Sequence, residues 1–282
     1  MIHFERDHIT VFQSSLYMTT TAIIQTDDVM IMTDPNWLPN EVQEIREYID
    51  RHNGNKQLYI VYTHSDFDHI IGSGAFPEAK VIAAEEFQNN LQKDETIKKI
   101  HKFDQGYYLK RNYEPVYPSV DYPVSSDGEV LDLGQLTLTF YKAPGHTNDS
   151  LFTVIEPLGI FLSGDYLSDV EFPFIFSSYT DYVKTLGTAE YILSRHSINY
   201  HIPGHGSVTE NQKEIENRIN DSKYYLYQLL VDERMVEKHC REKYAFFEAT
   251  ESIHLENIKK AKNEEVGKGH SLLFYKESKY GK

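Results

Sequence analysis

Four short segments rich in His and Asp each follow a predicted β-strand, and they constrain the fold more than any other feature of the sequence. The segments are 63–69 (THSDFDH), 144–150 (PGHTNDS), 162–166 (LSGDY) and 202–206 (IPGHG). Gly and Pro flank three of the four, as expected where the backbone turns sharply to aim a side chain. Sites collect at strand ends of α/β sheets, and imidazole with carboxylate suits zinc, iron or manganese. The pattern therefore predicts a metal site.

Strands and helices alternate along the chain in the hydrophobic pattern. Expected strands cover 9–17, 20–33 (with a turn at Asp27-Asp28), 57–63, 79–83, 135–141, 151–155, 159–163 and 198–202. Expected helices cover 39–52, about 85–103 and about 181–195, and the pattern is helical from about 209. We expect one domain over 1–282 with two mixed halves, about 1–142 and 143–282, and sheets sandwiched between helices in an α/β arrangement.

Two loops rich in aromatic residues, 105–127 and 171–179, interrupt this pattern. The first is expected to be ordered, because a linker would contain fewer aromatic side chains. The tyrosines of the first loop and Phe172, Phe174 and Phe176 of the second are expected to pack the loops. Alternatively, these side chains cover an active site that takes an apolar substrate, or they form a homodimer contact. The last twenty residues carry several Lys and are expected to fray.

Composition excludes several classes of protein. The chain has 282 residues, 40% of them hydrophobic, which is enough for a sizeable core and argues against disorder. Its net charge of −15 argues against nucleic-acid or anionic-membrane partners and leaves a small-molecule substrate. The single Cys240 excludes an internal disulfide or a thiolate cluster. No apolar run reaches membrane-spanning length and the start, MIHFERDHIT, lacks the apolar core of a signal peptide, so a cytoplasmic location is expected.

In residue type, spacing and order, the four segments resemble the signature of the metallo-β-lactamase superfamily. That signature is a His-x-His-x-Asp-His cluster, a lone His in Gly-His-Thr, a lone Asp in Gly-Asp and a late His. The resemblance runs from about Asp34 to Gly206, most of the chain. It implies an αββα sandwich, two mixed sheets flanked by helices, with a dinuclear metal site at the edge where the sheets meet.

The resemblance also assigns residues to the two metals. His64 and His146 would hold the first metal, Asp68, His69 and His205 the second, and Asp165 would bridge both. The other nine His residues are assigned no function, as expected of ordinary surface or core His.

Three further positions carry predicted roles. Asp34 matches a family Asp that supports the metal-binding loop through hydrogen bonds, which fix the orientation of the ligands. Asp68 is the candidate to orient the nucleophile and relay its proton. Tyr166 directly follows Asp165, so its hydroxyl either hydrogen-bonds a developing oxyanion or leaving group or simply covers the strand end.

Asp66 departs from the commonest family pattern, which has a second His there. It either binds metal or only hydrogen-bonds to Ser65 or His64. As a ligand, Asp66 would make the metal core formally neutral, because three carboxylates (Asp66, Asp68 and Asp165) and a bridging hydroxide would balance the charge of two divalent cations. A neutral core is a weaker Lewis acid. Zinc is the expected metal, and the extra carboxylate makes iron or manganese the alternatives. Related flavodiiron proteins carry a carboxylate at this position and bind iron, although this chain has no room for their flavodoxin domain.

The resulting hypothesis is a metal-dependent hydrolase, in which a metal-bridging water or hydroxide attacks the carbonyl of an ester, thioester or lactone. A true β-lactamase is not expected, because those enzymes are exported. A nuclease is not expected either, because the large RNA-binding insertions of those members are not found. The alternatives are an iron-dependent redox enzyme of the same fold and a non-catalytic ligand-sensing effector.

Overall fold

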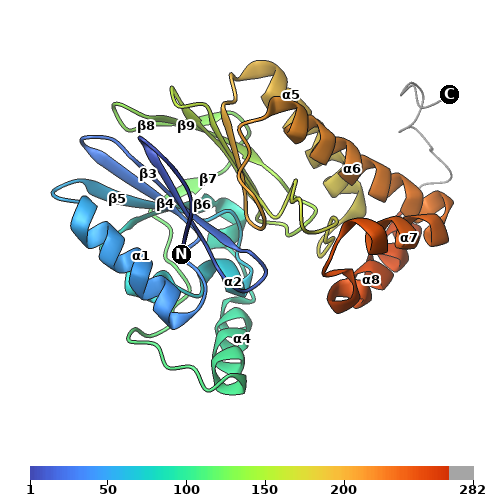
Figure 1. Ribbon diagram of the computed structural model, residues 1–282, viewed down its shortest axis with the longest axis horizontal. Helices are drawn as coiled ribbons and strands as arrows, with labels where there is room; N and C mark the ends of the chain where they lie inside the picture. The colour runs from blue at the N-terminus through green and yellow to red at the C-terminus, as the bar shows by residue number, and fades with distance from the viewer. Residues whose placement is uncertain (267–282) are drawn as a thin grey trace.

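Two β-sheets lie face to face between two layers of helices in the computed structural model, which describes residues 1–266 (Figure 1). Helix α1 lies on the outer face of the first sheet, and α5 and α6 cover the outer face of the second (Figure 1). The predicted αββα sandwich is thus confirmed. Residues 267–282, and with them most of the tail expected to fray, lie outside the described residues.

The first sheet has seven strands in the order β1-β2-β3-β4-β5-β6-β7. Their bounds are β1 Ile2–Arg6, β2 Ile9–Gln13, β3 Thr20–Gln25, β4 Val29–Thr33, β5 Gln57–Val61, β6 Lys80–Ala84 and β7 Tyr122–Val124. Strands β1 to β4 pair antiparallel and β4 to β7 pair parallel, so this sheet is mixed.

The second sheet has five strands in the order β12-β11-β10-β9-β8. Their bounds are β8 Glu129–Asp132, β9 Thr137–Lys142, β10 Leu151–Glu156, β11 Ile160–Gly164 and β12 Tyr200–Pro203. The pairs are antiparallel except β11 with β12, so this sheet is also mixed.

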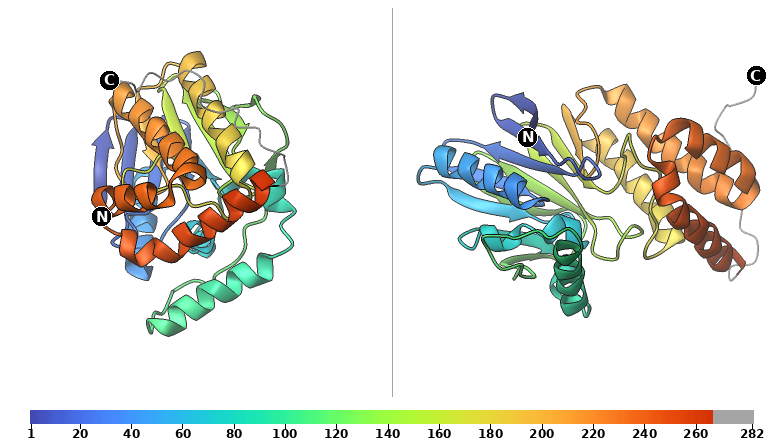
Figure 2. Two further views of the ribbon diagram at one scale, coloured as in Figure 1. Left: turned by 90° about the vertical axis from the view of Figure 1, so that its right-hand side faces the viewer. Right: turned by 60° about the horizontal axis from the view of Figure 1, so that its bottom comes forward.

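The helices are α1 Pro39–His52, α2 Phe67–Ile70, α3 Glu85–Gln88, α4 Lys93–Gly106, α5 Tyr179–Arg195, α6 Gln212–Val231, α7 Glu233–Lys243 and α8 Phe247–Val266. Helix α4 projects away from the sheets, whereas α5 to α8 pack together (Figure 2). A 3-10 turn covers Ser73–Ala75. Among the described helices, none is both long enough and apolar enough to cross a membrane.

Strand β4 shows how the layers are held together. Val29 and Ile31 belong to the apolar cluster between the sheets, whereas Met30 and Met32 pack with Val42 of α1. A strand buried on both faces has a continuous apolar sequence, as here. Burying each such side chain contributes about 1.5–3 kcal/mol.

Several elements differ from the sequence prediction. The helix expected over 85–103 is two helices, because the Asn90 side chain accepts a hydrogen bond from the Gln92 backbone at 2.7 Å and so competes with helical pairing. The strand expected to reach 17 ends at Gln13, because a turn follows in which the Ser14 hydroxyl accepts from the Leu16 amide and Tyr17 and Met18 have positive φ angles. Strands β1, β7 and β8 were not predicted, because exposed edge strands bury few residues and leave little hydrophobic pattern. Strand β7 lies within the segment 105–127 that was expected to be a loop.

Candidate metal centre

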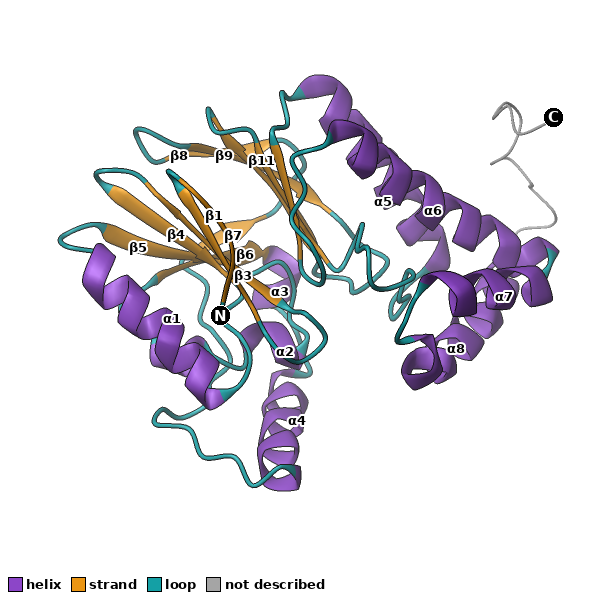
Figure 3. Cartoon of the chain, in the orientation of Figure 1, coloured by secondary structure: helices purple, strands orange, loops and turns teal. Residues whose placement is uncertain are grey.

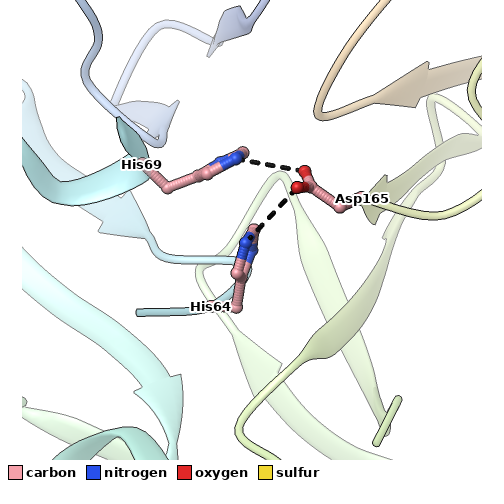
Figure 4. Close-up of side chains that lie close together, drawn as sticks. All are labelled: His64, His69 and Asp165. Atoms are coloured by element: carbon pink, nitrogen blue, oxygen red, sulfur yellow. Dashed lines mark ion pairs between the residues drawn. The ribbon is translucent and has the colours of Figure 1, made fainter. Parts of the chain in front are cut away.

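The four predicted segments meet at one edge of the sandwich, where loops connect the strand ends (Figure 3). His64 follows β5, His146 follows β9, Asp165 follows β11 and His205 follows β12. The short helix α2 turns the chain so that Asp68 and His69 also reach this point. His64, His69 and Asp165 point toward one another in Figure 4. The structure therefore brings the predicted ligand residues together.

Three overlapping groups of three side chains have the spacing of metal sites, one of them His64, His69 and Asp165. The other two, His64 with Asp66 and His146, and Asp68 with His69 and His205, share no residue. In the first of these two, the Asp66 Oδ2 atom lies 3.8 Å from His64 Nε2 and 3.4 Å from His146 Nε2. In the second, Asp68 Oδ2 lies 3.4 Å from His69 Nε2 and 3.5 Å from His205 Nε2. Within each group the ligand atoms lie within 4.8 Å of one another.

Asp165 lies between the two groups. Its Oδ1 atom is 3.1 Å from His69 Nε2. Its Oδ2 atom is 3.2 Å from His146 Nε2, 3.3 Å from His205 Nε2 and 3.6 Å from His64 Nε2. One carboxylate thus contacts imidazoles of both groups, as the bridging position requires.

Each imidazole is held through its Nδ1 atom. The Nδ1 of His146 donates to the Phe174 carbonyl at 2.8 Å, and that of His205 to the Tyr17 carbonyl at 2.9 Å. In a neutral imidazole, an Nδ1 that donates leaves Nε2 with a free lone pair. Once a cation displaces the proton on Nε2, the Nε2 atoms that face the centre can therefore bind it.

Asp34 connects the first ligand cluster to the sheet. Its carboxylate accepts hydrogen bonds from the Thr63 amide at 2.9 Å, the Thr63 hydroxyl at 2.6 Å and His69 Nδ1 at 3.0 Å. Because the Thr63 hydroxyl donates to Asp34, it accepts from His64 Nδ1, which lies 3.0 Å away. One buried carboxylate thus sets the orientation of two imidazoles, and these contacts are those that the predicted role of Asp34 requires.

The donor set fits divalent cations. His64 Nε2, His146 Nε2 and Asp165 Oδ1 are buried and have no hydrogen-bond partner, even though they lie close to one another. Buried polar atoms in folded proteins are almost always hydrogen-bonded, so three neighbouring atoms without a hydrogen-bond partner require another explanation. A cation bound between them would satisfy all three.

The electrostatics of the centre favour positive charge. Burial alone would raise the pKa of Asp165, but the surrounding imidazoles, His205 and His69 above all, hold it well below its usual range. Burial lowers the pKa of His146, yet Asp165 and Asp66 outweigh burial and raise it to about 10. The carboxylates therefore stabilise positive charge in the centre, either as protons on the imidazoles or as bound cations.

Gly204 allows Asp165 and His69 to approach each other. A Cβ atom at position 204 would lie 2.4 Å from Asp165 Oδ1 and 3.0 Å from His69 Cε1. The first distance is shorter than real Cβ contacts and the second is tighter than almost all of them, so a side chain at position 204 would displace Asp165 or its surroundings. Gly145 has a similar role beside His146, because its φ of +132° is open to glycine alone and a Cβ there would meet the Tyr182 backbone.

Tyr166 does not reach the cleft, which corrects the expectation that its hydroxyl faces a substrate. Its side chain is 1% exposed, and its ring packs against Phe152 and Tyr182. The hydroxyl donates to the Ala143 carbonyl at 2.8 Å and accepts from the His146 amide at 2.9 Å. Tyr166 therefore covers the strand end, the alternative interpretation of its position, and fixes the loop that carries His146.

The centre opens into a cavity of about 930 Å³. Besides predicted ligand residues, its lining includes the connection 89–92 with α4, the loop 171–179, one face of α8, residues 147–149, Tyr17 and Trp37. Glu171 lies in this lining, with its Oε1 atom 3.9 Å from His205 Nδ1, and burial raises its pKa to about 7. Sequence reasoning missed Glu171, because nothing in the sequence distinguishes it from the many other acidic residues.

Helix α8 holds the loop 171–179 in place. Asn257, fully buried, donates to the Pro173 carbonyl at 2.7 Å and accepts from the Ile175 amide at 3.1 Å. These two bonds bracket Phe174, whose carbonyl accepts from His146. Helix α8 is therefore connected to the candidate metal centre by two successive hydrogen-bonded contacts.

A family model of the metallo-beta-lactamase superfamily matches residues 16–217. The chain belongs to this superfamily. The match confirms the resemblance drawn from the four segments, and it ends within α6, so α7 and α8 lie beyond it. No curated protein matches the sequence.

Solved structures of the superfamily share the fold at low sequence identity. A metallo-β-lactamase from Cronobacter sakazakii, a HARLDQ motif mutant, has a TM-score of 0.57 at 15% identity, over 83% of this chain and 98% of the other. A superfamily protein from Sulfolobus tokodaii has a TM-score of 0.52 at 20% identity, over 81% and 88%. A B3 metallo-β-lactamase described by its active-site glutamic acid has a TM-score of 0.55 at 20% identity, over 82% and 91%.

Proposed function

We propose that this metallo-β-lactamase superfamily protein is a hydrolase that uses two divalent metal ions to cleave an ester, thioester or lactone of a small molecule. One observation carries the proposal: four His Nε2 atoms converge on Asp165, and those of His64 and His146 are buried without a hydrogen-bond partner. The connected cavity is large enough for a small-molecule substrate.

The residues of the centre divide the work. His64, Asp66 and His146 would hold one metal, Asp68, His69 and His205 the other, and Asp165 would contact both. Bound there, the metals would acidify a water molecule and polarise the substrate carbonyl. Asp68 would accept the proton that the water loses as its oxygen bonds to the carbonyl carbon. It would return this proton to the leaving oxygen or sulfur as the C–O or C–S bond breaks.

We propose zinc as the resident metal, because four imidazoles contribute to the centre. Asp66 supports iron or manganese as alternatives. Burial would raise the pKa of Asp66, but its hydrogen bond with His146 and the neighbouring imidazoles lower it to about 2, so it is a carboxylate at neutral pH. A third carboxylate adds the oxygen ligation that iron and manganese accept more readily than zinc.

An iron-dependent redox enzyme is a second candidate, favoured by the position of Asp66 3.4 Å from His146 Nε2. The B3 metallo-β-lactamase named above is described by an active-site glutamic acid, so a carboxylate in such a site also accords with hydrolysis. Iron-loaded protein that consumes oxygen, with no hydrolysis by the zinc form, would favour the redox enzyme. Hydrolysis by the zinc form without oxygen consumption by the iron form would exclude it.

The hydrolase is tested with zinc-loaded protein and a panel of esters, thioesters and lactones. His64→Ala and Asp165→Ala should lower both zinc affinity and turnover by about 100-fold or more, since loss of supporting residues alone costs up to that much. His101→Ala is the matched control, because this half-exposed His lies outside the centre. Full activity in either ligand variant would contradict the assignment.

A further inference from the structure

Large apolar side chains remain exposed around the cavity. Leu91 is 99% exposed and Phe176 is 44% exposed, and both line the cavity. Leu91 lies in the break between α3 and α4, where the sequence predicted a continuous helix. Exposed apolar side chains that surround one hollow next to polar groups are typical of a site for an apolar ligand.

The aromatic residues of the loop 171–179 have different roles. Phe172 is buried among core residues, so it packs the loop as predicted. Phe174 is half-buried and Phe176 exposed, and both face the cavity. The ring of Phe176 lies 5.0 Å from that of His146, centre to centre, so this apolar surface begins beside the metal centre.

Helix α8 extends the same surface. Ile253 lines the cavity, and both Ile253 and Phe174 pack against the core cluster that includes Phe172 and Tyr225. The bonds from Asn257 to both sides of Phe174 fix the helix to the loop. The two elements that carry the surface are therefore fixed to each other beside Phe174. We call Phe174, Phe176 and Ile253 the acyl wall.

Charge restricts what can lie in the cavity. Of the described residues that line it, six carry a carboxylate, whereas one, Lys99, carries an amine. Even with two divalent cations bound, this lining offers no surplus of positive charge for a substrate with several phosphate groups. An uncharged chain meets no such penalty.

We propose that the acyl wall binds the apolar acyl chain of the substrate, which makes the substrate an ester or lactone with an uncharged alkyl chain of several carbons. The inference rests on the proposed hydrolase function. It places the carbonyl at the metal centre beside His146 and the chain along Phe176, Phe174 and Ile253.

The test compares p-nitrophenyl acetate with p-nitrophenyl octanoate on zinc-loaded, full-length protein. Wild-type kcat/KM should be at least about tenfold higher for octanoate, since each buried methylene favours binding. Phe176→Asp and Ile253→Asp, on two separate elements, should each lower the ratio of octanoate to acetate kcat/KM by about tenfold. Phe176→Leu, which keeps an apolar side chain, should retain the wild-type kcat/KM for p-nitrophenyl octanoate. Phe246→Asp, at an exposed Phe outside the cavity, is the control.

A binding measurement separates failure of this inference from failure of the hydrolase function. Trp37 is the single Trp of the chain and lines the cavity, so its fluorescence can report the binding of the free octanoate ion, compared with the free acetate ion, without turnover. Octanoate binding that exceeds acetate binding and is lost in Phe176→Asp supports the wall even if no ester is hydrolysed. Turnover that is equal for both esters, or octanoate binding unchanged in both Asp variants, would overturn it.

Discussion

The Nε2 atoms of His69 and His205 lie 3.2 Å apart, although 136 positions separate the two residues in the chain. The Nδ1 atom of each imidazole, on the opposite side of the ring, donates a hydrogen bond: that of His69 to Asp34 and that of His205 to the Tyr17 carbonyl. Two neutral Nε2 lone pairs at this distance repel unless a proton or a cation lies between them. The two halves of the sandwich thus place paired donors where a metal ion would remove the repulsion.

Replacing Asp34 with Asn should weaken metal binding while the fold remains. The amide cannot accept from Thr63 and His69 as the carboxylate does, so both imidazoles lose their fixed orientation. We expect zinc affinity to fall by about 10–100-fold, measured by competition with a chromogenic chelator. Asp50→Asn, at an exposed position of α1, is the control. Wild-type affinity in Asp34→Asn would show that Asp34 has no supporting role.

Gly204→Ala should disturb the metal centre more than the stability of the protein. The new Cβ would displace Asp165 or His69, and zinc affinity should fall by about tenfold or more. Gly187→Ala in α5 is the matched control, because a Cβ there meets no atom within 4 Å. That change should leave zinc affinity unchanged and stabilise the helix by up to about 1 kcal/mol. Equal zinc affinities in the two variants would contradict the close approach at Gly204.

Tyr166→Phe should affect stability rather than chemistry. Removing the hydroxyl leaves the His146 amide without its partner, which should lower the free energy of unfolding by about 1–3 kcal/mol in urea titrations. If the hydroxyl only positions the loop, kcat at saturating substrate should change less than about tenfold. A loss of about 10³-fold in kcat with unchanged stability would instead make Tyr166 a catalytic residue.

Glu264→Gln should destabilise the protein at neutral pH and not in acid. Burial would raise the pKa of Glu264, but bonds from the Thr180 and Tyr179 amides and the Ser178 hydroxyl lower it below its ordinary value of 4.5. A carboxyl whose pKa is lower when folded stabilises above its unfolded pKa, and this contribution is lost as pH falls through the folded pKa.

The expected difference at pH 7 is about 0.3–1 kcal/mol, the range for an anion at a helix N-terminus. Urea titrations of metal-free wild type and Glu264→Gln at pH 7 and at successively lower pH would show the difference shrink below pH 4.5, the ordinary value of a Glu. A difference that stays constant with pH would contradict the role of the charge.

The residues that meet at the candidate metal centre could be predicted from sequence because each lies in a short segment with its own local pattern. His64, Asp66, Asp68 and His69 fall within six residues, and glycines mark the turns at Gly145 and Gly204. The family pattern then supplied their order. The buried strands were also predictable, since β4 and β11 each begin with a run of apolar residues, VMIM and IFL.

The cavity wall could not be predicted, because it depends on contacts between distant parts of the chain. Asn257 bonds to Pro173 across 84 positions, and no local pattern in α8 indicates this. Leu91 reaches the cavity only because Asn90 interrupts a helix that the hydrophobic pattern favours. The orientation of Tyr166 also depends on packing, since a Tyr after Asp165 can point either way until its neighbours are known.

The most direct test is a titration of metal-free protein with zinc, followed by equilibrium dialysis and elemental analysis. The wild type should bind two equivalents. His64→Ala and His205→Ala should each bind about one, because each removes a ligand from a different group. Fewer than one equivalent in the folded wild-type protein, or two retained in both variants, would contradict the account of a dinuclear centre.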